Sequence, residues 1–231
     1  AFKKAVEDDE IAGVLMEPIQ GEAGVRVPDD TYLKDVVKIC KEKNILFIAD
    51  EVQTGIARTG KMLASDLLGI RPDILILGKA LSGGVLPVSC VMADDEIMLT
   101  IKPGQHGSTF GGNPLASAVA LEAMQVVLDE KLAEKADYLG KIFRAEMQKL
   151  IEVSDLVKLV RGKGLLNAVV INDSEDSSTA WDICVKMAEN GLLAKPTHGN
   201  IIRFAPPLVI TEEQLLDCCR IIRETIVNFS K

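Results

Sequence analysis

The sequence lacks the features of a secreted, zinc-binding or membrane-spanning protein. No apolar run approaches the ~20 residues that are needed to cross a bilayer. The cysteines are odd in number, and only Cys218 and Cys219 are close together. This spacing fits neither a disulfide framework nor a zinc site built from Cys-x-x-Cys pairs. We therefore expect reduced, mostly buried thiols in an intracellular protein.

Histidine and basic residues are also scarce. His106 and His198 are the only histidines, and neither lies in a His-Glu-x-x-His motif, so we assign no metal. The 26 lysines and arginines are outnumbered by 34 aspartates and glutamates, which gives a formal net charge of −8. Nucleic acids and anionic membranes attract basic surfaces, so this balance argues against both as main partners.

What the sequence does contain is typical of a globular protein. Of its 231 residues, 48% are hydrophobic and 26% are charged. This length is sufficient to bury a sizeable core without disulfides or metals. The chain opens with Ala1-Phe2-Lys3-Lys4, with neither methionine nor a signal-peptide pattern. We therefore expect Ala1 to be a cut end.

The first half of the chain alternates short apolar runs with helical patterns. Apolar runs predict strands at residues 11–16, 45–49, 74–77 and 85–92. Periodic apolar residues predict helices at residues 31–44 and 61–68. Continuous apolar runs between helices are typical of a parallel sheet whose two faces are both buried. We expect an α/β fold here, with a mostly parallel sheet and helices on both faces, as part of a large domain over residues 1–135.

The order of predicted strands and helices changes in the second half of the chain. Asn113-Pro114 predicts the start of a long helix, because an N-cap residue precedes a proline at the first helical position. Further helices are expected at residues 131–150 and 178–190, and a capping box at Thr211 predicts a last helix. Strands are expected at residues 156–160, 165–171, 192–194 and 201–204, with the stretch 161–164 as a turn. We expect a small α+β domain over residues 136–231.

Three of the predicted strands of the first half end next to a charged residue. These residues are Glu17, Asp50 and Lys79, each followed by glycine within a few positions. Ligands of open α/β sheets bind beyond the carboxyl ends of the strands. A partly desolvated lysine has a lowered amine pKa, which favours its nucleophilic form. A carboxylate close by could hold the protonated ring nitrogen of pyridoxal phosphate, so the set predicts a lysine Schiff-base site.

Five blocks of sequence carry a resemblance to a known family. In order, they are residues 17–24, 47–60, 76–84, 97–114 and 193–208. Together they resemble the class III aminotransferases of fold type I, and most closely the ornithine aminotransferase branch. The resemblance runs from about residue 11 to residue 229. It implies pyridoxal 5'-phosphate as cofactor, with Lys79 as the Schiff-base lysine, Asp50 paired with the ring nitrogen and Gln53 near the ring hydroxyl.

The resemblance also implies roles for residues farther along the chain. Ser108 and Thr109 precede a helix start and would reach the phosphate of the neighbouring subunit's cofactor, which implies a homodimer with shared active sites. Arg203 resembles the arginine that binds the substrate carboxylate, and Glu22 is expected as its partner. Their ion pair would stay closed with ornithine and open with 2-oxoglutarate. Glu17 either supports the same site or ends its strand.

The activity that the resemblance implies is the transfer of the δ-amino group of L-ornithine to 2-oxoglutarate, giving glutamate-5-semialdehyde and glutamate. Another class III enzyme, acting on N-acetylornithine or 4-aminobutyrate, is the nearest alternative. A nucleotide-binding module is disfavoured because no Gly-x-Gly-x-x-Gly follows a strand. The family's glycine-rich phosphate loop is not found in this chain, so an incomplete fragment that serves as an interaction unit is a further alternative. We expect the mitochondrial matrix in a eukaryote and otherwise the cytoplasm.

Overall fold

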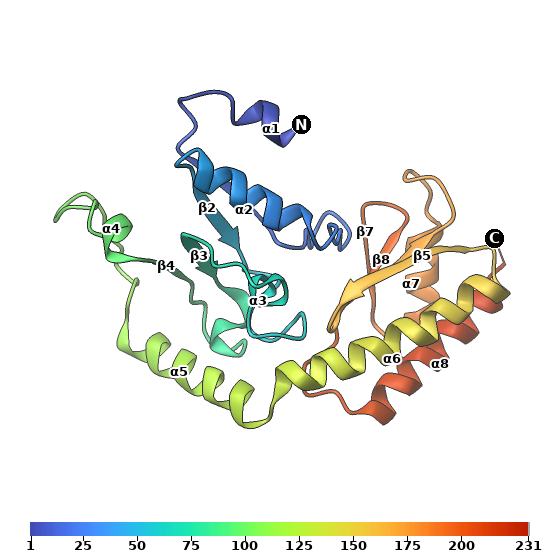
Figure 1. Ribbon diagram of the computed structural model, residues 1–231. Coiled ribbons are helices and arrows are strands. Elements are labelled where there is room, and N and C mark those ends of the chain that lie inside the picture. Colours follow the sequence, from blue (N-terminus) through green and yellow to red (C-terminus); the bar gives the residue numbers. More distant parts are fainter. Residues whose placement is uncertain (231) are drawn as a thin grey trace. The chain divides into compact units, whose positions relative to one another are not determined.

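The computed structural model describes residues 1–230, which fall into two compact units (Figure 1). The first unit comprises residues 1–18, 28–56 and 62–131. The second comprises residues 19–27 and 57–61 together with the chain from Leu132 onward. Two short segments from early in the sequence therefore belong to the unit built mainly by the C-terminal part of the chain. No helix among residues 1–230 is long and apolar enough to cross a membrane.

The first unit contains a sheet of four strands. They are β1 (Gly13–Met16), β2 (Leu46–Asp50), β3 (Ile74–Leu77) and β4 (Cys90–Ala93), in this spatial order. The first three are parallel, and β4 runs antiparallel to β3. The predicted, mainly parallel sheet is therefore confirmed. The fourth strand is shorter than predicted, because pairing with β3 begins only at Cys90.

Six helical segments accompany this sheet. They are α1 (Phe2–Ala5), α2 (Tyr32–Glu42), α3 (Ala64–Leu68), the 3-10 helix η1 (Lys79–Ser82), α4 (Asp95–Met98) and α5 (Pro114–Asp129). Helix α2 lies beside β2 (Figure 1). Its apolar stripe, which includes Leu33 and Cys40, is buried together with Phe47 of β2. On the opposite face of the sheet, Leu15 remains 60% exposed and Val91 54% exposed. The described residues leave this face partly uncovered, and the second helical layer stays a prediction.

The second unit contains an antiparallel sheet. Its strands are β5 (Val157–Lys163), β6 (Leu166–Ile171), β8 (Ile201–Phe204) and β7 (Lys195–Thr197), in this spatial order. Residues 161–163 pair with β6, so the prediction of a turn over residues 161–164 is wrong, and only Gly164 and Leu165 form the turn. The strand predicted at 192–194 lies three residues later, because it is placed by pairing with β8.

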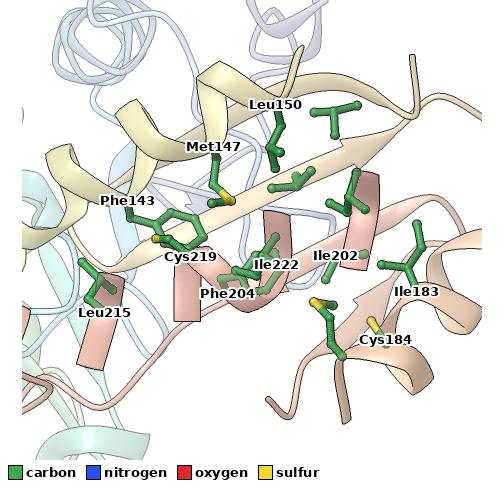
Figure 2. Packing of buried hydrophobic residues seen from close by; sticks show 14 of the residues in the cluster. Phe143, Met147, Leu150, Ile183, Cys184, Ile202, Phe204, Leu215, Cys219 and Ile222 are labelled. Atoms are coloured by element: carbon green, nitrogen blue, oxygen red, sulfur yellow. The ribbon is translucent and has the colours of Figure 1, made fainter. Parts of the chain in front are cut away.

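Three helices, α6 (Leu132–Val153), α7 (Thr179–Glu189) and α8 (Glu212–Val227), build the main core of this unit. Figure 2 shows Phe143 and Met147 of α6 packed toward β8 and toward Ile222 of α8. The rings of Phe143 and Phe204 have centroids 5.3 Å apart. Burial of each such side chain contributes about 1.5–3 kcal/mol.

A second apolar cluster lies under the segment 19–27. Ile19 and Val25 of this segment are buried with residues of β6 and β8, namely Leu166, Ala168, Val170 and Ile201. Because the first core and this cluster both draw on β6, every residue of that strand is buried. The segment that carries Glu22 is thereby fixed to the antiparallel sheet by its own hydrophobic contacts.

Candidate active site

The carboxyl ends of β1, β2 and β3 meet at one edge of the parallel sheet. Residue Glu17 follows β1, Asp50 is the last residue of β2, and Lys79 follows β3 after Gly78. The three strands are neighbours in this order. The structure therefore brings the three charged strand ends to the edge where ligands of α/β sheets bind.

Asp50 is half-buried and has one oxygen engaged. Its Oδ1 accepts a hydrogen bond from the backbone N–H of Val52 at 3.0 Å. The next residue is tied to the neighbouring strand, because Glu51 N donates to Ile76 O at 2.9 Å. Among residues 1–230, no donor contacts the second oxygen, Oδ2. The carboxylate is thus oriented and still has an acceptor that could take a proton donor from a ligand.

Glu51 is a site residue that the sequence interpretation did not identify. Its side chain is only 1% exposed and lies at the start of helix α3. It accepts hydrogen bonds from Thr54 Oγ1 (2.8 Å), Ala64 N (2.7 Å), Ser65 N (2.8 Å) and Ser65 Oγ (2.6 Å). These four bonds join the turn after Asp50 to α3. The sequence offers no signal for the three bonds from Ala64 and Ser65, because these donors lie 13 and 14 positions away.

Lys79 opens the 3-10 helix η1 with a positive φ of 45°. This conformation is uncommon for a residue with a side chain and is found mainly where a fold or a function requires it. The expectation that the strand end desolvates Lys79 is wrong for this chain, since the side chain is exposed. No carboxylate among residues 1–230 forms an ion pair with its amine. The amine is therefore accessible to a ligand.

A cavity of about 970 Å³ lies beside Lys79. Ser108, Gly111, Gly112 and Asn113 line it together with Lys79, so the loop before α5 and the end of β3 share one space. Ser108 Oγ accepts from Gly111 N at 2.9 Å, and Asn113 caps α5 by accepting from Ala116 N at 2.9 Å. An amine, a hydroxyl and a glycine-rich helix start are the donors that suit a phosphate. The residues present fit a phosphorylated, carbonyl-bearing cofactor.

Two further predicted residues lie outside the lining of this cavity. Thr109 is exposed in the loop before α5, next to Ser108. Gln53 lies in the turn that follows Asp50 and is half-buried. Val52, which lies between Asp50 and Gln53 in the sequence, approaches Gly78, where an added Cβ would lie 3.5 Å from Val52 Cγ1. The cofactor roles of Gln53 and Thr109 stay predictions.

The second unit brings Glu22 and Arg203 together. Arg203 Nη1 donates to Glu22 Oε1 at 2.8 Å, and the side chains are 18% exposed for Arg203 and 56% exposed for Glu22. Arg203 lies in the middle of β8, where an unpaired guanidinium would be costly. The more exposed partner is the carboxylate, so Glu22 can leave the pair for solvent while Arg203 stays fixed to the sheet.

Three basic side chains of this unit donate to carbonyl oxygens of the backbone or of an asparagine instead of to carboxylates. Arg161 donates through Nε (3.1 Å) and Nη2 (2.8 Å) to Gly24 O, close to Glu22. Arg58 Nη1 donates to Leu165 O at 3.2 Å and to Pro206 O at 2.6 Å, and burial lowers the pKa of Arg58 to about 10. Arg144 Nη1 donates to Asn167 Oδ1 at 2.8 Å and to the carbonyl of the β5–β6 turn. The sequence interpretation missed all three.

The cysteines are poor candidates for chemistry. Burial raises the pKa of Cys184 and of Cys219 to about 12, and it also raises the pKa of Cys40. A thiol with a raised pKa is a weak nucleophile at neutral pH, because the thiolate is the reactive form. Within residues 1–230, no group of three or more His, Cys, Asp or Glu side chains is arranged to hold a metal ion.

Comparison with known proteins yields relatives along the whole chain. The chain is 56% identical to the mitochondrial ornithine aminotransferase of Rattus norvegicus, covering 99% of this chain and 52% of that protein. It is 59% identical to the ornithine aminotransferase of Schizosaccharomyces pombe, covering 94% of this chain and 49% of that protein. The chain thus spans about half the length of the curated relatives that it matches.

Solved structures of aminotransferases are also similar to this chain. An acetylornithine aminotransferase from Elizabethkingia anophelis is 65% identical, with a TM-score of 0.96, over 99% of this chain and 57% of that one. The ornithine aminotransferase of Toxoplasma gondii, in a structure with partial occupancy of PLP at the active site, is 48% identical, with a TM-score of 0.93, over 98% of this chain and 53% of that one. The family model described as aminotransferase class-III matches residues 1–226. The chain therefore belongs to the class III aminotransferases, a family of pyridoxal-phosphate enzymes.

Proposed function

We propose that the protein carrying this chain is an aminotransferase that moves the δ-amino group of L-ornithine to 2-oxoglutarate, giving glutamate-5-semialdehyde and glutamate. The observation that supports this most directly is the Glu22–Arg203 ion pair. An arginine fork binds a carboxylate in a bidentate manner, and a paired glutamate can mask that fork. The 56% and 59% identity to the rat and fission-yeast ornithine aminotransferases supports the choice of substrate.

Four residues of the first unit are proposed to hold pyridoxal phosphate. When bound, this cofactor supplies an electron sink for deprotonation at the amine-bearing carbon of the substrate. Asp50 would accept a hydrogen bond from the protonated ring nitrogen through its available oxygen and so keep that nitrogen protonated, and Gln53 would contact the ring hydroxyl. Ser108 would donate to the phosphate of the cofactor in the neighbouring subunit. Lys79 Nζ would attach the cofactor and, when the substrate amine replaces it, carry the proton between the substrate carbon and the cofactor.

Glu22 and Arg203 are proposed to let the enzyme bind both substrates of the cycle, with their ion pair closed for ornithine and open for 2-oxoglutarate. Ornithine reacts through its δ-amine, so its reacting end carries no carboxylate and Arg203 can remain covered by Glu22. 2-Oxoglutarate carries a carboxylate next to its carbonyl, and binding it requires Arg203 to be uncovered. The exposed position of Glu22 supports an opening of this pair without loss of the strand that holds Arg203. Glu17 is proposed to support the same reaction from the end of β1.

The assembly is proposed to be a homodimer with shared active sites. Ser108 and Thr109 would then serve the cofactor of the neighbouring subunit. Helix α5 supports a partner on this side, because Leu115, Leu121 and Leu128 are 66%, 74% and 57% exposed. We further propose that the antiparallel unit is the small C-terminal domain of the fold. If the source is a eukaryote, the mitochondrial relatives support a location in the mitochondrial matrix.

A second candidate donor is N-acetylornithine. The 65% identity to the acetylornithine aminotransferase of Elizabethkingia anophelis favours it, since that identity exceeds the 56% found with the rat ornithine enzyme. Both donors react through an amine on the same carbon skeleton and use the same acceptor. They differ at the α-nitrogen, which is charged in ornithine and a neutral amide in the acetylated compound.

The donor can be tested with the full-length protein loaded with pyridoxal phosphate. We expect kcat/KM for L-ornithine to exceed that for N-acetylornithine by at least about tenfold, with 2-oxoglutarate as acceptor. The Lys79→Ala variant should abolish turnover of both donors. The reverse preference would transfer the assignment to N-acetylornithine, and turnover of neither donor by the loaded wild-type protein would disprove the proposed activity.

A further inference from the structure

The segment that carries Glu22 is a closed loop. Gln20 and Arg26 exchange two backbone hydrogen bonds, with N···O distances of 2.9 and 3.2 Å. Within the loop, Gly24 N and Val25 N both donate to Gly21 O, at 3.2 and 3.1 Å. Gly24 and Val25 adopt positive φ angles of 97° and 52°. Glu22 is therefore displayed from a tight turn and not from a freely moving stretch of chain.

Two side chains fasten this loop to the antiparallel sheet, one at Glu22 and one at Gly24. Thr197 Oγ1, on β7, donates to the backbone oxygen of Glu22 at 2.6 Å. Arg161, on β5, directs Nε and Nη2 to the oxygen of Gly24. A Cβ at Gly24 would lie 2.5 Å from Ile201 Cδ1, so the loop backbone rests directly on the sheet.

The sheet register explains how these anchors come to surround the ion pair. Arg161 lies opposite Ala168, and Ala168 lies opposite Arg203. Residues opposite each other in antiparallel strands point to the same face, so both arginines project toward the loop with the small Ala168 between them. Their strands are two spacings apart, roughly 10 Å. One arginine holds the loop backbone while the other receives the loop's carboxylate.

We propose that Thr197 and Arg161 are positioning residues that fix the backbone of Glu22, so that the Glu22–Arg203 pair opens by rotation of the Glu22 side chain alone. This proposal rests on the proposed function and specifies how its substrate switch is set. The anchors determine the fraction of time for which Glu22 covers Arg203. They therefore set the affinity of the enzyme for 2-oxoglutarate relative to its affinity for ornithine. Loosening either anchor uncovers Arg203 without removing any group that contacts the substrate.

The test compares Thr197→Val, Glu22→Gln and the double variant in the full-length enzyme loaded with its cofactor. Each half-reaction is followed in single turnovers by absorbance, once with L-ornithine and once with 2-oxoglutarate. For Glu22→Gln we expect about three- to fivefold tighter apparent binding of 2-oxoglutarate, as an exposed ion pair of up to about 1 kcal/mol allows. Thr197→Val should tighten the apparent binding of 2-oxoglutarate about twofold. The double variant should bind 2-oxoglutarate no more tightly than Glu22→Gln alone.

A second readout does not depend on turnover. Hydrogen exchange at the amides of Gly24 and Val25 should accelerate in Thr197→Val and in Arg161→Lys. Arg161→Lys keeps the positive charge but loses the pair of hydrogen bonds that Nε and Nη2 donate to Gly24 O. The control is Thr225→Val, the same change at another buried threonine of the same unit, and it should alter neither readout.

The outcomes separate this inference from the proposed function. If Glu22→Gln shifts the binding of 2-oxoglutarate but Thr197→Val does not, or if the two effects simply add, then the anchoring role is wrong and the switch stands. Unchanged exchange at Gly24 in both anchor variants would also overturn the anchoring role. If Glu22→Gln itself has no effect, the switch fails, and with it the inference.

Discussion

At the residue scale, Glu51 is a buried carboxylate with no basic partner among residues 1–230. Its two oxygens accept two hydrogen bonds each, from the turn after Asp50 and from the start of α3. A buried charge is tolerated only when hydrogen bonds replace its hydration. Bonds to a charged acceptor are stronger than those between neutral groups, so Glu51 stabilises the connection that orients Asp50.

We expect Glu51→Gln to lower the free energy of unfolding of the cofactor-free protein by about 3 kcal/mol. The amide keeps the shape of the carboxylate but turns an NH₂ group toward two N–H or O–H donors, leaving them unsatisfied. Chemical denaturation followed by circular dichroism measures the change. Glu42→Gln, which removes an exposed partner of Lys38, should change stability by less than about 0.5 kcal/mol. Equal stability of both variants would contradict the role given to Glu51.

The strand-end residues could be predicted from the sequence, whereas the residues that position them could not. Asp50 and Lys79 each follow a continuous apolar run, and such runs are local signals. Glu51, Arg161 and Thr197 act on groups at distances of 13 to 175 positions. No pattern within a window of the sequence contains both partners of these contacts, so only the folded chain identifies them.

At the scale of helices and strands, features set by neighbouring residues agree with the prediction, whereas a feature set by distant pairing does not. Strand β3 and strand β8 have the predicted bounds, and the caps at Asn113 and Thr211 form as predicted. Caps are predictable because donor and acceptor lie three residues apart. The turn predicted at 161–164 is wrong because Gly162 and Gly164 suggest a loop, while pairing with β6 extends the strand through Lys163. Tertiary pairing here outweighs local preference.

Helix α6 approaches the β5–β6 turn so closely that only glycine fits at the contact. A Cβ at Gly140 would lie 1.9 Å from Gly164 O and 2.4 Å from the carbonyl carbon. Because both sides of this contact are backbone, neither can move aside cheaply. We expect Gly140→Ala to destabilise the protein by about 3 kcal/mol despite the better helix propensity of alanine.

The unfolding midpoint in denaturant measures this effect. Ala145→Ser adds one atom at an exposed position of the same helix and should cost at most about 0.5 kcal/mol. A Gly140→Ala variant as stable as the wild-type protein would mean that α6 and the turn are not in backbone contact.

At the scale of the whole molecule, the described residues leave apolar surface uncovered in the first unit. Helix α5 has only two charged residues, Glu122 and Asp129, and Ala116 is its only buried residue. A helix that is apolar on nearly all sides is normally buried. Burying each exposed leucine would contribute about 2 kcal/mol. Because the chain spans about half the length of its curated relatives, further polypeptide is available to cover this surface in a protein of their size.

The proposed second copy of the protein would cover the exposed face of α5 and would give Ser108, just before this helix, a place beside the partner's cofactor. We expect Leu128→Glu to weaken the homodimer by at least about 2 kcal/mol, or roughly thirtyfold in dissociation constant, because it buries an unpaired charge at the interface. Sedimentation velocity of the full-length protein over a range of concentrations measures the constant. Leu193→Glu, at a leucine that is 87% exposed in the other unit, is the matched control and should leave it unchanged. Equal dissociation constants for the two variants would remove α5 from the interface, and a monomeric wild-type protein would rule out the shared active site.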